Sequence, residues 1–328
     1  MATIRDVAAQ AGVSTATVSY VLNGQGAIPA ETQARVMAAV AALDYQPRHA
    51  ARALRGRSRT LGISMVSGYD RLADPAMAEV LAGMAHEASR QGLALLLIPR
   101  HDDAARTCVT VARSGQVDGI LVCDPAADDA RVDALQHAGV MAVSLAPQGA
   151  AWVMSDIAHG MQLAVQHVVG LGHRRIALIA PDVALATSEW YIDGFVAALA
   201  DVGLDVLDGG VVAGGRREVD GEAAMLELMN APEMPTAVIA ASDELAYGAM
   251  RVVRDAGLVV GRDVSLIGFD DLPPAAYMQP PLTTIRQPRF AMGEAAVRML
   301  VAQLAGAPAQ TQVLAPTLMV RASTGIVG

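Results

Sequence analysis

The sequence of 328 residues contains no lysine and only two cysteines, Cys108 and Cys123. Without lysine, neither a phosphate-binding P-loop nor a Schiff-base mechanism is available. No stretch approaches the roughly 18 consecutive apolar residues of a membrane span. The N-terminus places Arg5 and Asp6 where a secretory signal requires apolar residues. These absences predict a cytoplasmic protein that has free thiols and no membrane partner.

Motifs of common enzymes are also missing from the sequence. There is no Gly-x-Ser-x-Gly, no Gly-x-Gly-x-x-Gly and no His-Glu-x-x-His pattern. The seven histidines are scattered, and none belongs to a Cys/His cluster with the spacing of a zinc site. We therefore expect a protein that is not an enzyme and holds no cofactor or metal.

Charge is distributed unevenly along the chain. Its overall net charge is -9, but residues 1–59 contain seven arginines and three acidic residues, a net charge of +4. The remaining residues hold 17 basic and 30 acidic side chains, a net charge of -13. This asymmetry predicts two parts that bind different partners.

The first 45 residues or so predict three short helices. Thr3 and Asp6 have the spacing of a capping box, Gly12 ends the first helix, and Ser14 is a good N-cap for the second. A third helix is expected from about Pro29. Two helices joined by a tight turn form a helix-turn-helix, whose second helix enters the major groove of DNA; the alternative is an ordinary three-helix bundle. The polar face expected on the second helix comprises Thr15, Ala16, Ser19, Tyr20 and Asn23.

An arginine-rich segment, residues 48–58, follows these helices and is too short to be a stable isolated helix. Leu54 is its only large apolar side chain. Apolar side chains flanked by arginines can wedge between base steps in the minor groove. The alternative is that Leu54 packs on the larger part of the chain.

From Thr60 onward, apolar runs alternate with amphipathic helices, which predicts α/β domains with mostly parallel sheets covered on both faces. The chain contains more of these alternating strand and helix units than one doubly wound domain holds. We therefore expect two similar lobes with a cleft between them. The predicted strands include residues 61–66, 93–98, 119–123, 140–145, 176–180, 237–241, 264–269 and 313–320.

Four motifs stand out in the N-terminal segment, namely Ile4-Arg5-Asp6-Val7-Ala8, Ala11-Gly12-Val13-Ser14, Thr17-Val18-Ser19 and Val21-Leu22-Asn23. They resemble the headpiece of the LacI/GalR family of bacterial transcriptional regulators. Further motifs of the same family follow in order, and together they cover essentially the whole chain. They are Leu43-Asp44-Tyr45-Gln46-Pro47, Ala51-Arg52-Ala53-Leu54, Leu171-Gly172-His173-Arg174-Arg175, Ser242-Asp243-Glu244, Gly268-Phe269-Asp270-Asp271, Pro281-Leu282-Thr283-Thr284 and Arg321-Ala322-Ser323-Thr324.

The resemblance implies a homodimer that reads a pseudo-palindromic operator in double-stranded DNA, with a CG step at its centre. By position, the base-reading residues would be Thr15, Ala16 and Tyr20, and the backbone contacts would be Ser14, Thr17, Ser19 and Asn23. Leu54, with Ala51 and Arg52, would contact the minor groove. Tyr20 stands where many members have Arg or His, and Arg48 replaces a common Asn, so the flanks of the operator do not follow from the resemblance.

The resemblance also implies a periplasmic-binding-protein-like core that binds a small effector between its lobes. Asp270 falls where members bind ligand hydroxyls, although a carboxylate there could instead cap backbone amides. The other expected contacts are Tyr191, Ser242, Arg216 and Gln287, of which the first three replace a family Arg, Asn and aromatic residue. Arg289 also stands where an aromatic can occur. Arg216 and Arg289 either point to solvent or offer cations to an acidic or phosphorylated ligand.

These observations predict a headpiece (1–47), a hinge (48–58) and a core (59–328). Within the core, one lobe would span about 59–155 and 287–316, and the other about 156–286 and 317–328. The predicted function is repression of carbohydrate uptake or catabolism genes, controlled by a sugar or sugar derivative. A non-sugar effector or a purine-type corepressor is the alternative, and a sugar-binding transport protein is disfavoured by the basic headpiece and the absent signal peptide.

Overall fold

The computed structural model describes residues 3–22, 28–43, 58–65, 74–98, 103–123, 125, 129–182, 187–215 and 217–327. The chain divides into two compact units. The small unit holds Met1–Ser58 together with Arg113–Val117, and the large unit holds the rest. None of the described helices is long and apolar enough to cross a membrane.

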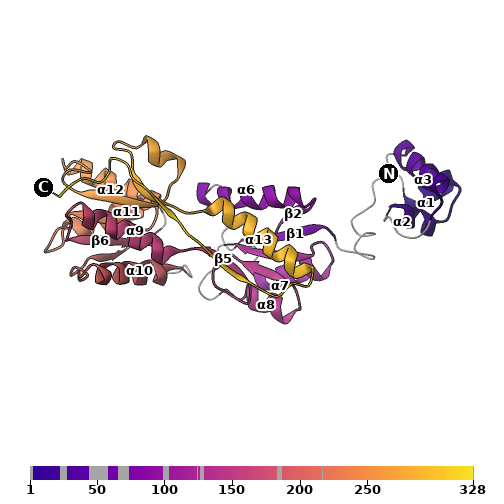
Figure 1. The fold of residues 1–328 in the computed structure, drawn as a ribbon, viewed down its shortest axis with the longest axis horizontal. Helices are drawn as coiled ribbons and strands as arrows, with labels where there is room; N and C mark the ends of the chain where they lie inside the picture. The colour runs from indigo at the N-terminus through magenta and orange to yellow at the C-terminus, as the bar shows by residue number, and fades with distance from the viewer. Residues whose placement is uncertain are drawn as a thin grey trace. The chain divides into compact units, whose positions relative to one another are not determined.

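The small unit contains three helices, α1 (Ile4–Ala11), α2 (Thr15–Leu22) and α3 (Ala30–Ala42) (Figure 1). The expected capping box is confirmed, because Thr3 N donates to Asp6 Oδ2 at 2.7 Å and Asp6 N donates to Thr3 Oγ1 at 3.4 Å. Gly12 closes α1 with a left-handed φ of 65°. Ser14 Oγ accepts from Thr17 N at 3.1 Å, so Ser14 caps α2 as predicted.

A small core holds the three helices together. Arg35 on α3 strengthens this core by donating from Nη2 to the carbonyl of Ala11 at 2.8 Å. Because this carbonyl lies at the end of α1, the guanidinium fixes α3 against the turn that precedes α2. The buried apolar residues are Val7, Ala8, Ala11, Val18, Val36 and Ala39.

The expectation that Ser19 lies on the exposed face of α2 is wrong. Its side chain is only 6% exposed, because Ser19 lies beside the buried Val18 on a short helix that packs against α1 and α3. A small hydroxyl side chain fits this packed face.

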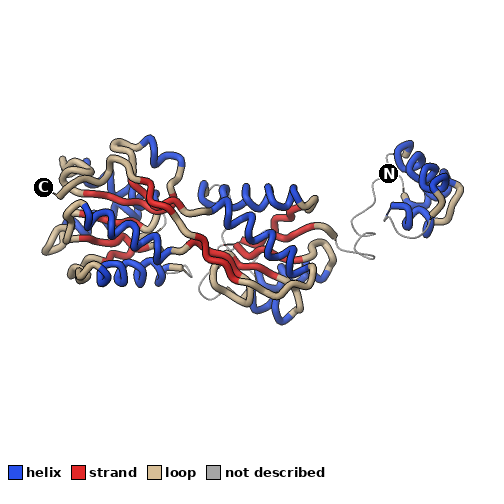
Figure 2. Tube along the Cα trace, viewed as in Figure 1, coloured by secondary structure: helices blue, strands red, loops and turns tan. Residues whose placement is uncertain are grey.

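The large unit consists of two lobes, each built on a six-stranded sheet among the described residues (Figure 2). The first sheet has the strand order β11-β5-β4-β3-β1-β2, with every neighbouring pair parallel. These strands are β1 (Thr60–Met65), β2 (Ala94–Ile98), β3 (Gly119–Cys123), β4 (Ala142–Ser144), β5 (Trp152–Ser155) and β11 (Thr311–Leu314).

Helices cover both faces of this first sheet (Figure 1). Two of them, α6 (Pro75–Arg90) and α13 (Arg289–Leu304), pack closely on each other on one side. The others are α7 (Ala104–Arg113) and α8 (Arg131–His137). We call this part the N-lobe.

The second lobe, the C-lobe, has the strand order β12-β10-β9-β8-β6-β7, in which only the β10–β12 pair is antiparallel. Its strands are β6 (Ile176–Ala180), β7 (Val211–Ala213), β8 (Ala237–Ala240), β9 (Ser265–Asp270), β10 (Thr283–Arg286) and β12 (Thr317–Met319). Its α-helices, which pack in the pairs α9–α10 and α11–α12, are α9 (Ile157–Gly170), α10 (Ser188–Asp201), α11 (Glu218–Met229) and α12 (Asp243–Asp255). A short 3-10 helix, η1 (Pro273–Tyr277), follows β9.

Within the described residues, the chain passes between the lobes after β5, after β10 and after β11. The last passage lies inside the apolar run of residues 313–320, which forms two short strands. Ala315 and Pro316 divide that run, so β11 joins the N-lobe sheet and β12 joins the C-lobe sheet. Proline lacks the backbone N–H that a continuous strand needs, which explains the division.

Candidate functional site

One candidate site is the outward face of α2 in the small unit. Thr15, Ala16 and Tyr20 are exposed, with Tyr20 at 48%, and Ser14 is exposed at the start of the helix. Thr17 is half-buried and lies 2.9 Å from Ser14, oxygen to oxygen. A short helix held by a core on one side and presenting hydroxyl, methyl and phenol groups on the other has the form of a major-groove reading helix.

Several predicted DNA contacts lie outside the described residues. They are Asn23, and Ala51, Arg52 and Leu54 of the arginine-rich segment.

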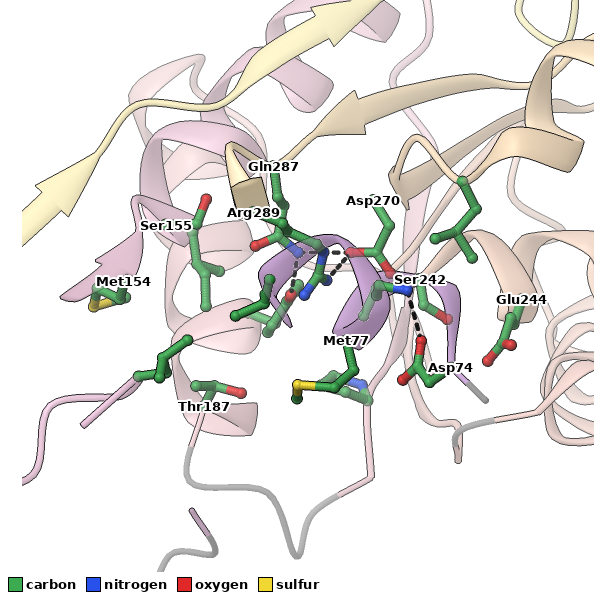
Figure 3. A pocket seen from close by; sticks show the side chains of 18 of the residues that line it. Asp74, Met77, Met154, Ser155, Thr187, Ser242, Glu244, Asp270, Gln287 and Arg289 are labelled. Carbon is green, nitrogen blue, oxygen red and sulfur yellow. Dashed lines mark hydrogen bonds and ion pairs between the residues drawn. The ribbon is translucent and has the colours of Figure 1, made fainter. Parts of the chain in front are cut away.

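The second candidate site is a cavity of about 190 Å³ in the large unit (Figure 3). Four of the five expected effector contacts line it, namely Asp270, Tyr191, Ser242 and Gln287, and the fifth, Arg216, lies outside the described residues. N-lobe residues complete the wall, so the cavity lies between the lobes. These N-lobe residues include Asp74, Ala76, Met77 and Val80 at the start of α6, and Met154 and Ser155 on β5.

Asp270 is the centre of the polar wall of this cavity. It ends β9 in the C-lobe, is 8% exposed, and accepts from Gln287 Nε2 at 2.6 Å. Arg289, the first residue of α13 in the N-lobe, forms an ion pair with the same carboxylate oxygen, Oδ1. The dashed lines of Figure 3 trace this group. The ion pair therefore joins the two lobes across the site.

The backbone at the end of β9 is unusual, because two consecutive residues other than glycine have positive φ, Asp270 at 131° and Asp271 at 60°. Such conformations are sparsely populated and occur mainly at functional sites. They send the two neighbouring carboxylates to different partners. The Asp271 carboxylate accepts hydrogen bonds from Arg286 Nε at 2.7 Å and from Arg321 Nη2 at 2.6 Å. Asp270 and Asp271 thus hold the passage from β10 to α13 from both sides.

Aromatic packing fixes the remaining wall. The Tyr191 ring meets Phe269 edge to face, with centroids 5.1 Å apart. Burial raises the pKa of the Tyr191 hydroxyl, and the neighbouring Asp270 charge raises it further, so this hydroxyl stays protonated. Ser242 caps α12 by accepting from Leu245 N at 3.2 Å, which positions its hydroxyl at the cavity wall.

The sequence left two questions open, whether the Asp270 carboxylate caps backbone amides and whether Arg289 points to solvent. The structure answers both. The interactions that the structure gives the Asp270 carboxylate come from side chains rather than from local backbone amides. Arg289 does not point to solvent, because its side chain is 18% exposed and pairs with Asp270.

Sequence reasoning missed several residues of the cavity. Ser155 ends β5, and the carboxyl ends of parallel strands are where open α/β sheets bind ligands, so recognising that short strand would have found it. Asp74 caps α6 by accepting from Ala76 N at 2.8 Å, and Glu244 follows the Ser242 cap. No motif in the sequence marks these two side chains as neighbours of one cavity.

Comparisons with known proteins match both parts of the chain. Residues 3–48 match bacterial regulatory proteins of the lacI family, and residues 165–324 match the periplasmic binding protein-like domain. The HTH-type transcriptional regulator MalR of Streptomyces coelicolor is 36% identical over 340 residues, covering 98% of this chain and 96% of that protein. The HTH-type transcriptional repressor PurR of Mannheimia succiniciproducens is 31% identical over 333 residues, covering 98% of each.

Among solved structures, the lac repressor dimer bound to operator and the anti-inducer ONPF superposes with a TM-score of 0.87. It is 30% identical to this chain, and the match covers 99% of both chains. Similarity of this extent runs through headpiece and core alike. The chain therefore belongs to the lacI family of bacterial regulatory proteins.

Proposed function

We propose that this chain is a cytoplasmic, homodimeric repressor of genes for carbohydrate uptake or catabolism. Each headpiece reads one half of a pseudo-palindromic operator, and a sugar or sugar derivative bound between the lobes releases the DNA. The observation that carries the proposal is that one chain combines the exposed face of α2 with a polar cavity between two lobes. The two relatives named above are a transcriptional regulator and a transcriptional repressor, which supports regulation rather than catalysis.

On the DNA side, Thr15, Ala16 and Tyr20 read base edges in the major groove. Ser14, Thr17 and Asn23 hold phosphates. Ser19 belongs to this backbone-contacting set as well, although its side chain is only 6% exposed. Leu54 enters the minor groove between Ala51, Arg52 and the other arginines of the segment, at a central CG step.

On the effector side, the Asp270 carboxylate accepts hydrogen bonds from hydroxyl groups of the ligand. Tyr191, Ser242 and Gln287 contribute further hydrogen bonds. The proposal is supported by their common position around one cavity. A ligand there touches residues of both lobes, so its binding favours one arrangement of the lobes over another. A ligand shifts such an equilibrium by its difference in affinity for the two arrangements.

Selection of bound sequences from a random DNA pool with the purified protein tests the DNA half directly. We expect a palindromic site with a CG centre to be enriched. Failure to enrich any site would overturn the proposal and leave the headpiece as an ordinary helical bundle.

Addition of a metabolite panel to the complex with the selected site tests the sign of control. We expect a sugar to weaken DNA binding. The alternative, a corepressor-dependent regulator with a non-sugar effector, requires a purine or another metabolite to strengthen it, and that result would replace the inducible repressor by the corepressor mechanism.

A further inference from the structure

Arg59 is the first residue of the large unit and directly follows the arginine-rich segment of residues 48–58. Its backbone has a left-handed φ of 54°, which is uncommon for a residue other than glycine and persists only where the surrounding structure enforces it. The Arg59 side chain is exposed, so burial does not impose this conformation. Hydrogen bonds from both its backbone and its guanidinium group hold it in place.

The backbone of Arg59 is tied to both strands that flank β1. Arg59 N donates to Asp118 Oδ2, immediately before β3, at 2.8 Å. The Arg59 carbonyl accepts from Ala94 N, at the start of β2, at 2.9 Å. Asp118 N in turn donates to the carbonyl of Thr60 at 2.8 Å. The residue that precedes β1 is therefore fixed on both sides of that strand.

The guanidinium group of Arg59 closes the end of helix α6. Its Nε and Nη2 donate to the Gly92 carbonyl at 3.2 and 3.0 Å, and Nη2 also donates to the Gln91 carbonyl at 3.0 Å. Gln91 is the C-cap of α6, and the carbonyls at a helix C-terminus favour a cation. A Cβ atom at Gly92 would lie 2.8 Å from Arg59 Nη2, so glycine leaves room for this contact.

Helix α6 is a rigid support for Arg59, because it packs closely on α13. It has 16 residues and is therefore about 24 Å long. Its first turns contribute Met77 and Val80 to the cavity wall, and its last carbonyls hold Arg59. One helix thus connects the cavity with the point at which the arginine-rich segment joins the N-lobe.

We propose that Arg59 is a positioning residue for operator recognition. It fixes the point at which the arginine-rich segment leaves the N-lobe, and it thereby sets the spacing of the two headpieces of the dimer. This inference rests on the proposed function, which supplies the dimer and the two-part operator. Without the anchor, each headpiece reaches half-sites over a wider range of spacings, and ordering it at the correct spacing lowers the operator affinity.

Arg59→Asn tests the anchor, because asparagine adopts left-handed backbone conformations readily but cannot reach the carbonyls of α6. Fluorescence anisotropy with the full-length protein compares the operator that the wild type selects, the same operator with one base pair added at its centre, and a scrambled duplex. We expect the variant to bind the selected operator about tenfold more weakly and to lose most of the preference for it over the lengthened operator. Unchanged affinity and an unchanged spacing preference would overturn the inference.

Asp118→Ala is a second variant, since it removes the acceptor of Arg59 N and leaves the guanidinium group intact. We expect it to weaken the same spacing preference. A wild-type preference in this variant would contradict a role for the backbone tie.

The salt dependence of binding separates positioning from a contact with a DNA phosphate. A lost phosphate contact lowers the slope of log affinity against log salt concentration by about 1 and weakens binding to scrambled DNA as well. Because the Arg59 donors are engaged by carbonyls of the protein, we expect Arg59→Asn to keep the wild-type slope and its affinity for the scrambled duplex. A reduced slope would assign Arg59 to DNA and overturn the positioning role.

Arg174→Asn is the matched control. Arg174 is also exposed, and its Nη1 donates at 3.2 Å to the carbonyl of Val169 in the last turn of α9, in the C-lobe. We expect a melting temperature close to that of Arg59→Asn and wild-type binding to all three duplexes. An equal loss of operator affinity in the control would show a general effect of stability and overturn the inference.

Selection from random DNA by the wild type distinguishes the two levels of the argument. An enriched operator whose spacing preference survives in Arg59→Asn would reject this inference alone. Failure of the wild type to enrich any operator would reject the proposed function.

Discussion

Asp243 is a buried carboxyl at the start of α12, close to the cavity but not part of its wall. Its Oδ2 accepts from Leu272 N at 2.6 Å, and its Oδ1 accepts from Thr284 Oγ1 at 2.5 Å. Burial raises its pKa to about 7, and the charge of Asp270 adds to this rise, while the two hydrogen bonds oppose it. A carboxyl group beside the cavity therefore changes charge near neutral pH.

Replacement of this group gives a prediction about stability and pH. The folded protein binds the Asp243 proton more tightly than the unfolded chain, whose ordinary value is 3.8. The contribution of Asp243 to the free energy of unfolding is therefore largest below pH 4, falls as pH rises towards 7, and is constant above it. One proton gives a slope of at most about 1.4 kcal/mol per pH unit.

Asp243→Asn abolishes this slope, because an amide does not titrate, yet still accepts from Leu272 N. Denaturant unfolding at pH 5, 6, 7 and 8 measures the difference between wild type and variant. Asp270 and Asp271, the charged neighbours of Asp243, remain in both proteins, so the difference reports Asp243 together with its coupling to these two carboxyls. Parallel pH profiles would contradict the prediction.

Tyr20 gives a prediction about specificity. Because its side chain is 48% exposed, Tyr20→Arg should leave the melting temperature of the protein nearly unchanged. An arginine there prefers guanine, to which it donates two hydrogen bonds. We therefore expect a changed base in each half-site after selection from random DNA. An unchanged consensus sequence would mean that Tyr20 reads no base.

At the scale of elements, glycines set how closely the helices of each lobe pack. A Cβ atom at Gly293 on α13 would lie 2.1 Å from the Val80 carbonyl oxygen on α6, and one at Gly83 on α6 would lie 2.0 Å from the Phe290 carbonyl oxygen. In the C-lobe, a Cβ at Gly248 on α12 would lie 1.9 Å from the Glu218 carbonyl oxygen on α11. Backbone atoms cannot yield as flexible side chains do, so these helix pairs require glycine.

Gly293→Ala is therefore expected to lower the free energy of unfolding by about 1–3 kcal/mol, since α13 must move away from α6. Gly170→Ala, at the end of α9, is the control, because a Cβ added there would have no atom within 4 Å. Alanine favours helix over glycine, so we expect the control to be neutral or stabilising by up to about 1 kcal/mol. Equal effects in urea denaturation would contradict the packing argument.

Local patterns predict most elements of the fold, and their failures have physical causes. The Thr3–Asp6 box, the Ser14 cap and the long apolar runs act within a few residues and appear in the structure where expected. Residues 313–320 have the composition of one strand, although two sheets share them. Composition does not show which sheet a strand joins. The prediction for Ser19 fails because a short helix inside a bundle buries more than its apolar stripe.

The residues that line the cavity are predictable only in part, because contacts between distant parts of the chain leave no local pattern in the sequence. Asp270, Tyr191, Ser242 and Gln287 follow from a family resemblance. The pairing of Arg289 with Asp270 depends on two residues 19 positions apart that meet across the lobes, and spacing carries no sign of it.

For the whole molecule, the passages between the lobes are the elements through which an effector can act. The passage from β10 to α13 is held by Asp270 through Gln287 and Arg289, and by Asp271 through Arg286. A ligand that binds Asp270 and Arg289 therefore bears directly on a connection between lobes. Such coupling is reciprocal, because the factor by which the effector changes DNA affinity equals the factor by which DNA changes effector affinity.

A measurement of this reciprocity tests the proposed mechanism most directly. Fluorescence anisotropy gives the affinity for the selected operator with and without saturating sugar, and calorimetry gives the sugar affinity with and without operator. We expect the sugar to weaken operator binding, and the operator to weaken sugar binding by the same factor, about 5- to 150-fold. An operator affinity that does not change with saturating sugar would contradict control of DNA binding through the cavity.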